Sequence, residues 1–120
     1  MTTVTRPFLL AGGILGAAGV ALSAAAAHAG GGNIATAANF LLFHAPAFLA
    51  LGLFGSNAGR VLKAGGWVTF AGLLLFAGDL LARHYLGDRL FPMAAPTGGT
   101  LMIAGWLVIA ASAFGTRRTT

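Results

Sequence analysis

Residues 95–114 read APTGGTLMIAGWLVIAASAF and contain no charged side chain. A helix that crosses the hydrocarbon core of a bilayer needs about 20 mostly apolar residues, because that core is about 30 Å thick and a helix rises about 1.5 Å per residue. This stretch has that length, and so do three earlier apolar runs, at residues 7–27, 34–54 and 61–82. The pattern predicts an all-α fold, a four-helix transmembrane bundle that forms one integral membrane domain over residues 1–120.

The composition excludes an ordinary soluble domain. Of the 120 residues, 58% are hydrophobic and 8% are charged, whereas a soluble domain has roughly 25% charged residues. The formal net charge of +5 comes from basic residues at the ends of the apolar runs, not from a basic cluster interleaved with aromatic residues. We therefore expect the lipid bilayer, and no nucleic acid, as a partner. Cysteine is absent, which excludes disulfides and thiolate chemistry.

The short loops separate the basic residues into two groups, and this division predicts the orientation of the bundle. The end that carries both termini has the larger group: Arg6, Arg60, Lys63, Arg117 and Arg118. The opposite end has only Arg83 and Arg89. Because cytoplasmic loops carry an excess of Lys and Arg, we expect both the N-terminus and the C-terminus in the cytoplasm.

The first apolar run has a second interpretation. Arg6, the apolar residues 8–22 and the small residues of Ala27-His28-Ala29 together have the pattern of a secretory signal peptide with its cleavage site. Cleavage there would leave three spans instead of four. The composition and pattern of the run leave both interpretations open.

His44 is the only ionisable residue of the second run. It stands about ten residues from the start of the run, or about 15 Å at the rise of a helix, and hence near mid-membrane. An ionisable group at that depth indicates a proton relay, a ligand contact or a subunit contact. The structural alternative is a neutral histidine that hydrogen-bonds to a neighbouring helix. Pro46 frees the carbonyl of Leu42 and predicts a helix kink close by.

Asp79 and Arg83 are four residues apart in the third run, and hence on one face of its helix. The structural interpretation is an ion pair that fixes the depth of the span near the outer surface. The functional one is the mouth of a proton or cation path, or part of a surface for a partner. His28 is expected at the same end, where a pair with Asp79 would form a hydrogen bond, a pH-sensitive latch or half of a metal site. His44, Asp79, His28 and Arg83 are thus the candidate intramembrane polar site.

Small residues indicate where helices pack closely. In the first run they recur at spacings of four, three and four, at Gly12, Gly16, Gly19 and Ser23. Such stripes let two helix backbones approach each other. Gly98, Gly99 and Gly105 indicate the same for the fourth run. The glycines do not show whether any of these faces makes a dimer.

The sequence lacks the residue sets that are typical of catalysis. None of its serines has a histidine at a spacing that would place the two side by side, and its two acidic residues are not paired. Three histidines and two acids without cysteine argue against a metal site. His28 and His44 differ in depth by about 15 Å, which argues against a haem held between them. We therefore expect no enzyme, no cofactor and no bound metal.

Several motifs in order along the chain resemble the YgdD-like family, small four-helix membrane proteins of unknown function. These motifs are Ala25-Ala26-Ala27-His28, Phe43-His44-Ala45, Phe76-Ala77-Gly78, Pro96-Thr97-Gly98-Gly99 and Ala104-Gly105-Trp106. The resemblance implies a retained first span and a bacterial inner-membrane location, with related proteins in mitochondria, but no activity. Similar proteins tend to carry polar residues one turn before the histidine of the second span, and those places are Asn39 and Leu41 here. The apolar Leu41 departs from that pattern, and so does Asp79, where similar proteins often have serine.

We expect a multi-pass inner-membrane protein without enzymatic activity that acts through helix–helix and lipid contacts. It would be an accessory subunit or organising factor of a larger membrane complex, or would associate with itself. The nearly uncharged spans and short loops favour this interpretation. The alternative is a small oligomeric transporter or channel for protons or cations, which would use His44 and Asp79. An enzyme that acts on a lipid or quinone is a third, less favoured alternative.

Overall fold

A computed structural model describes residues 3–115, and this part of the chain contains helices and no strand. The four long helices are α1 (Arg6–Ala29), α2 (Gly32–Phe54), α3 (Arg60–Tyr85) and α4 (Ala94–Gly115), and a short 3₁₀ helix, η1 (Gly55–Asn57), follows α2. Each long helix is long and apolar enough to cross a membrane. The prediction of an all-α bundle with four membrane-spanning helices is confirmed, and the helix ends agree with the predicted ranges to within three residues.

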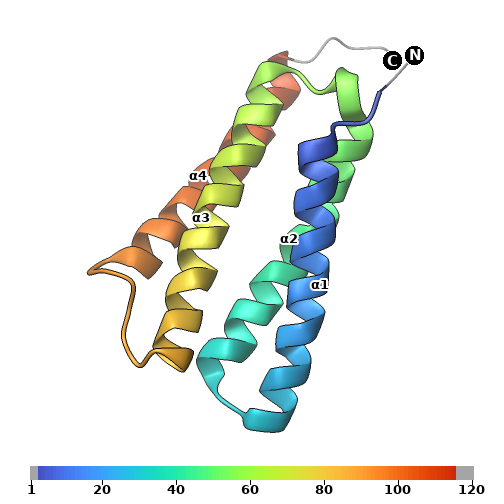
Figure 1. Ribbon diagram of the computed structural model, residues 1–120. Coiled ribbons are helices and arrows are strands. Elements are labelled where there is room, and N and C mark those ends of the chain that lie inside the picture. The colour runs from blue at the N-terminus through green and yellow to red at the C-terminus, as the bar shows by residue number, and fades with distance from the viewer. Residues whose placement is uncertain (1–2, 116–120) are drawn as a thin grey trace.

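The chain runs up and down, so that α1 and α2 form one hairpin and α3 and α4 form another (Figure 1). The connection between α1 and α2 consists of Gly30 and Gly31 alone, which have φ angles of 73° and 105°. Glycine adopts these positive angles without the steric penalty of a Cβ. The chain therefore reverses direction within two residues. Because the four helices alternate in direction, one end of the bundle holds the start of α1, the end of α2, the start of α3 and the end of α4 (Figure 1).

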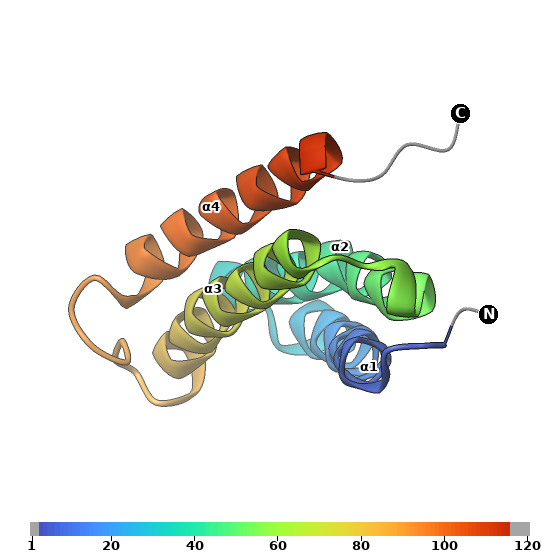
Figure 2. The same ribbon diagram turned by 90° about the horizontal axis from the view of Figure 1, so that it is seen from above.

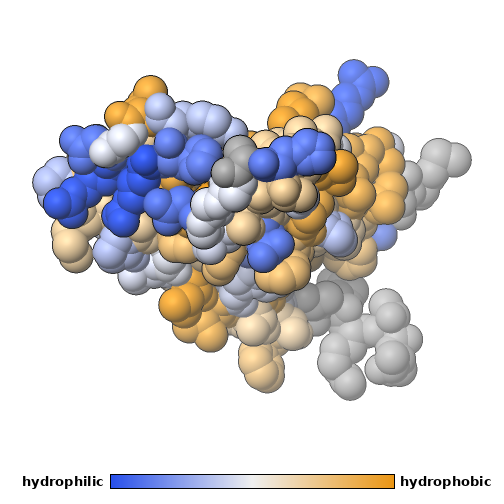
Figure 3. Space-filling model, turned by 90° about the horizontal axis from the view of Figure 1, so that it is seen from below, coloured by the Kyte–Doolittle hydropathy of each residue, from blue (hydrophilic) through white to orange (hydrophobic). Residues whose placement is uncertain are grey.

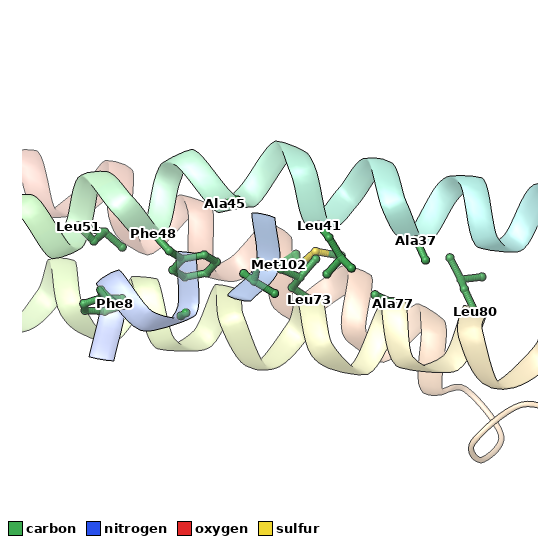
Figure 4. Packing of buried hydrophobic residues seen from close by; sticks show 12 residues of the cluster. Phe8, Ala37, Leu41, Ala45, Phe48, Leu51, Leu73, Ala77, Leu80 and Met102 are labelled. Atoms are coloured by element: carbon green, nitrogen blue, oxygen red, sulfur yellow. The ribbon is translucent and has the colours of Figure 1, made fainter. Parts of the chain in front are cut away.

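The helices α2 and α3 join the two hairpins, with α1 packed along α2 and α4 packed along α3. Seen from above, α4 lies at the outer edge of the bundle (Figure 2). The buried side chains of the core lie mainly where α2 faces α3, as Leu41 and Leu73 do (Figure 4). Phe8 extends this core from α1, because its ring stacks on that of Trp67 in α3 with centroids 4.3 Å apart. Among the described residues, Met102 is the one buried residue that α4 contributes to this cluster, and Ala94 is buried at the start of α4.

The glycine stripe of α1 lies against α2. A Cβ built on Gly12 would lie 2.8 Å from the side chain of Leu49, and one built on Gly19 would lie 2.7 Å from that of Leu42. Gly16 lies between them, and its added Cβ would be in ordinary contact with Ala45, at 3.7 Å. Leucine side chains of α2 thus fill the space that the missing side chains of α1 leave. Ser23, at the end of the stripe, is half-buried.

The glycines of α3 and α4 bring these two backbones together more closely. A Cβ on Gly98 would lie 2.5 Å from the backbone nitrogen of Phe76, and one on Gly105 would collide with Thr69. Gly99 was predicted to pack as well, but a Cβ built there has no atom of the described residues within 4 Å. Successive helical residues differ in direction by about 100°, so Gly99 faces away from the contact that Gly98 makes.

The segment before α1 is tied to the end of α2. The amide of Thr5 donates to the carbonyl of Gly52 at 2.8 Å, and the amide of Ser56 donates to the carbonyl of Thr3 at 2.9 Å. The last carbonyl groups of a helix have no partner within the helix itself. These bonds satisfy one such carbonyl and fix the start of α1 beside the turn that leads to α3.

Candidate functional site

His44 lies in the middle of α2, with 6% of its surface exposed. Its Nδ1 lies 2.7 Å from the carbonyl oxygen of Phe40, one turn earlier. Its Nε2 lies 3.1 Å from the indole nitrogen of Trp106 in α4. A carbonyl can only accept a hydrogen bond and an indole N–H can only donate one. From these partners we assign the neutral tautomer, in which Nδ1 carries the proton and Nε2 accepts.

Trp106 is the partner of His44 that sequence reasoning missed. The sequence places this tryptophan in mid-span, but it does not show that α4 comes within side-chain reach of α2. His44 and Trp106 each stand twelve residues after the first residue of their helices, Gly32 and Ala94. Since α2 and α4 run in the same direction, both side chains lie about 18 Å from the same end of the bundle. This equality of depth is the signal that could have identified the pair.

Aromatic rings enclose the imidazole of His44. The ring of Phe40 stacks on it with centroids 6.2 Å apart, and that of Trp106 lies at 5.7 Å. Phe76 of α3 packs against Phe40 in turn, with centroids 4.7 Å apart. The two hydrogen bonds of the imidazole therefore lie inside an apolar shell.

Pro46 lies within α2 on its exposed side, and the helix continues past it to Phe54. The proline has no backbone N–H, so the carbonyl of Leu42 lacks its usual partner in the helix. This position, two residues after His44, is the predicted place of the kink.

Asp79 is completely buried and uses both of its carboxylate oxygens. Its Oδ2 accepts from Nε and Nη2 of Arg83, each at 3.0 Å. Its Oδ1 accepts from the backbone amide of Leu90 at 2.7 Å. Arg83 is partly exposed, with 39% of its side-chain surface accessible. The carboxylate thus ties the loop between α3 and α4 to the end of α3, a contact that the sequence did not suggest.

His28 does not join this cluster. It is exposed at the end of α1, and no hydrogen bond or ion pair between described residues links it to Asp79. The pair of His28 and Asp79 that was considered from the sequence does not form. Both carboxylate oxygens of Asp79 are bound instead by Arg83 and by the amide of Leu90. At this end of the bundle, the ring of His84 in α3 lies close to the turn at Gly31 between α1 and α2.

The candidate residues thus form two separate clusters, one at mid-depth and one at the end of α3. Every buried side-chain nitrogen or oxygen of the described residues has a hydrogen-bond partner. Within residues 3–115, no three His, Cys, Asp or Glu side chains come together as metal ligands would. The His44 cluster is neutral and joins α2 to α4, whereas the Asp79 cluster is an ion pair within α3 that also binds the loop after it.

Known proteins share much of this sequence. The sequence profile of a family described as "Protein of unknown function (DUF423)" matches residues 13–99, which include His28, His44, Asp79 and Arg83. The UPF0382 membrane protein YwdK of Bacillus subtilis is 32% identical over 121 aligned positions, which cover 90% of this chain and 96% of that protein. A UPF0382 membrane protein of Haemophilus influenzae is 32% identical over 83 residues, or 68% of this chain and 65% of the relative.

A UPF0382 membrane protein of Staphylococcus haemolyticus is 30% identical over 78 residues, 65% of this chain and 64% of the relative. The chain therefore spans a little less than two thirds of the staphylococcal relatives that it matches. No solved structure has significant similarity to this chain. Together with the four apolar helices, the matches show that the chain is a membrane protein and belongs to the DUF423 family of proteins of unknown function.

Proposed function

We propose that this chain is a multi-pass protein of the bacterial inner membrane with both termini in the cytoplasm. Arg6, Arg60 and Lys63 lie at the end of the bundle where α1 begins. Arg83 and Arg89 lie at the other end, where Asp79 and Asp88 offset their charge. The excess of positive charge at the first end supports its assignment to the cytoplasmic side. The proposal includes the assignment of the chain to the YgdD-like proteins of its family, which rests on the motifs around His28, His44 and Gly98.

Within the membrane, we propose that the protein acts without catalysis, as an accessory or organising protein that works through helix–helix and lipid contacts. One observation supports this proposal: every buried side-chain nitrogen and oxygen of the described residues has a hydrogen-bond partner. A polar group that is held by fixed partners in an apolar shell stabilises the fold. Surface contacts are then the features of the bundle that remain available for function.

A proton or cation path would need different surroundings for its polar groups. Intramembrane residues of such paths face water-filled cavities or one another in chains. His44 instead bonds to an indole and a backbone carbonyl, and Asp79 lies at the end of α3 with its own partners. The two residues belong to separate clusters. The arrangement supports the accessory role over the transporter role that the sequence left open.

The test of this role starts from the tagged protein in its native membrane. We would extract it with a mild detergent, separate the complexes by size and identify their components by mass spectrometry. The proposal predicts a partner protein in fixed stoichiometry, or a defined homo-oligomer that conducts no ions in liposomes. A homo-oligomer with a proton or cation flux would contradict it.

Two variants of His44 separate the structural and transport roles. In His44→Gln, the amide can accept from Trp106 and donate to the carbonyl of Phe40, but it cannot titrate. We expect normal abundance and unchanged partner recovery for this variant. His44→Ala loses both bonds, so we expect its abundance to fall. Loss of function in His44→Gln at normal abundance would support a proton-carrying role instead.

A further inference from the structure

An apolar groove runs between α2 and α4 and has a volume of about 450 Å³. Ala47, Ala50 and Phe54 form its wall on α2, and Trp106 and Ile109 form its wall on α4. Phe54 and Trp106 are 44% and 41% exposed, so the groove opens towards the surroundings of the bundle. The hydrogen bond from Trp106 to His44 fixes the indole at the deep end of the groove.

A second cavity, of about 230 Å³, lies between the start of α3 and the end of α4. The residues that line it include Asn57, Arg60 and Ser112. Leu62 lines both this cavity and the apolar groove, so the two hollows adjoin each other. An apolar groove that reaches mid-membrane therefore has beside it, towards the end of the bundle, a cavity with Arg60 in its lining.

The two hollows share one stripe of α4. Trp106 and Ile109 line the groove, and Ser112 and Gly115 line the second cavity, at intervals of three residues. The stripe covers about 14 Å along the helix. Half of a hydrocarbon core is about 15 Å thick. The combined hollow therefore has the depth of a single leaflet.

The described basic residues on α3 at this end of the bundle have no acidic partner among residues 3–115. No ion pair of the described residues involves Arg60 or Lys63. The chain has only two acids, Asp79 and Asp88, and they belong to the end of α3 and the loop after it. Figure 3, a view from that opposite end, shows hydrophilic surface gathered over the end of α3 and its loop. Among the described residues, Arg60 is thus a cation without an acidic partner, in the wall of the cavity that shares Leu62 with the apolar groove.

We propose that the groove and the adjoining cavity bind one anionic phospholipid. An acyl chain would lie along α2 and α4 down to Trp106, and the phosphate would pair with Arg60 at the membrane surface. Basic pockets between transmembrane helices on the cytoplasmic side bind anionic headgroups in this way. The inference rests on the proposed membrane role and orientation, and it assigns the lipid contact of that role to one site.

The lipid site can be tested by native mass spectrometry of the purified protein in detergent. The protein is mixed with phosphatidylglycerol or with phosphatidylcholine of the same acyl chains. We expect one phosphatidylglycerol to be retained, and phosphatidylcholine to be retained much less. Arg60→Gln should weaken phosphatidylglycerol retention about tenfold, the size expected for one charge-assisted hydrogen bond. Arg6→Gln removes the same charge at the same end, on α1, and should change nothing.

A second pair of variants tests the apolar part of the site. Ala50→Phe fills the groove, whereas Ala104→Phe adds the same ring at an exposed position of α4 outside it. Helix content by circular dichroism and elution volume show whether each variant is folded. We expect lipid retention to fall in Ala50→Phe only.

Equal retention of the two lipids, or equal effects of Arg60→Gln and Arg6→Gln, would overturn the lipid site. So would a dimer that Ala50→Phe dissociates, because a second copy would then occupy the groove. None of these outcomes changes the partner or flux results that test the proposed function, so the two proposals can fail independently.

Discussion

The two helical hairpins use small residues in different ways. In the α1–α2 hairpin, most of the glycines in the contact belong to α1, and leucine side chains are the nearest atoms, as Leu42 is for Gly19. Gly52 of α2 faces Leu9 of α1 in the same way. In the α3–α4 hairpin, both helices contribute glycines, and a Cβ on Gly72 would lie 2.6 Å from the backbone of α4. In the first hairpin, the nearest atoms to an added Cβ belong to leucine side chains, and backbone atoms follow at 2.8 Å or more. In the second hairpin, the nearest atoms at Gly72 and Gly98 are backbone atoms, at 2.6 and 2.5 Å.

This difference shows that a glycine pattern predicts closeness but not its degree. The α3–α4 hairpin has the less regular glycine spacing and the tighter contact. It also carries most of the polar chemistry, with Asp79 and Arg83 at one end, Arg60 at the other and Trp106 between them. The α1–α2 hairpin adds His44 and is otherwise almost entirely a packing unit.

The largest effect is expected at the tight contact between α3 and α4. In Gly98→Ala, the new Cβ would lie 2.5 Å from the backbone nitrogen of Phe76, which cannot rotate away. The helices must then separate, and we expect a loss of about 3 kcal/mol in the free energy of unfolding. Unfolding in a detergent titration, followed by circular dichroism, measures it. Gly99→Ala, whose Cβ meets no described atom, is the matched control and should lose nothing.

The next effect concerns the end of the same hairpin. Asp79→Ala removes the acceptor of the Leu90 amide and the partner of Arg83. We expect a loss of about 2 kcal/mol, because a buried donor is left unpaired while the partly exposed Arg83 can turn to water. The backbone amide of Leu90 should also exchange its hydrogen faster in this variant. Unchanged protection of that amide would contradict the assigned role of Asp79.

A smaller loss is expected in the α1–α2 hairpin. The Cβ of Gly12→Ala would lie 2.8 Å from the side chain of Leu49, which can move in part, and 2.9 Å from its backbone nitrogen, a longer distance than the 2.5 Å at Gly98. We expect a loss of about 1–2 kcal/mol, measured as for Gly98→Ala. Gly13→Ala, at an open position on the same helix, is the control. If Gly12→Ala were as damaging as Gly98→Ala, the contrast between the two hairpins would be wrong.

The smallest effect is expected at the hydrogen bond between Trp106 and His44, which joins the two hairpins. Trp106→Phe keeps an aromatic ring but removes the N–H that His44 accepts. Hydrogen bonds between transmembrane helices contribute about 0.6 kcal/mol on average and at most about 1.7 kcal/mol, so we expect a loss of about 1 kcal/mol. The His44 ring signals in an NMR spectrum should shift. If Trp106→Phe lost more free energy of unfolding than Gly12→Ala, the contribution of this hydrogen bond to stability would exceed that of a single bond between helices.

Much of the fold follows from the sequence because a membrane imposes length and apolarity on each span. The helix ranges, the stripe at Gly12 and the face shared by Asp79 and Arg83 depend only on positions along one helix. The bond from Trp106 to His44 depends on which helices are neighbours and how each is rotated. Those variables are set by the packing of all four helices. They also decide that Gly98 faces α3 while Gly99 faces away from it.

The loop between α3 and α4 was beyond prediction for a second reason. Met93 adopts a positive φ of 71°, which its side chain does not favour, and the amide of Leu90 folds back onto Asp79. Both features belong to tertiary contacts of an irregular segment, which has no periodic pattern to read. The same holds for His28, whose depth could be predicted but whose neighbours could not.

In the proposed function, the polar groups inside this bundle hold the fold and carry no ions. The most direct test reconstitutes the purified protein into liposomes with an internal pH indicator and imposes a proton gradient. We expect the proton leak to equal that of protein-free liposomes, while an added ionophore collapses the gradient. A protein-dependent proton flux that disappears in His44→Gln would contradict the account and make His44 part of a proton path.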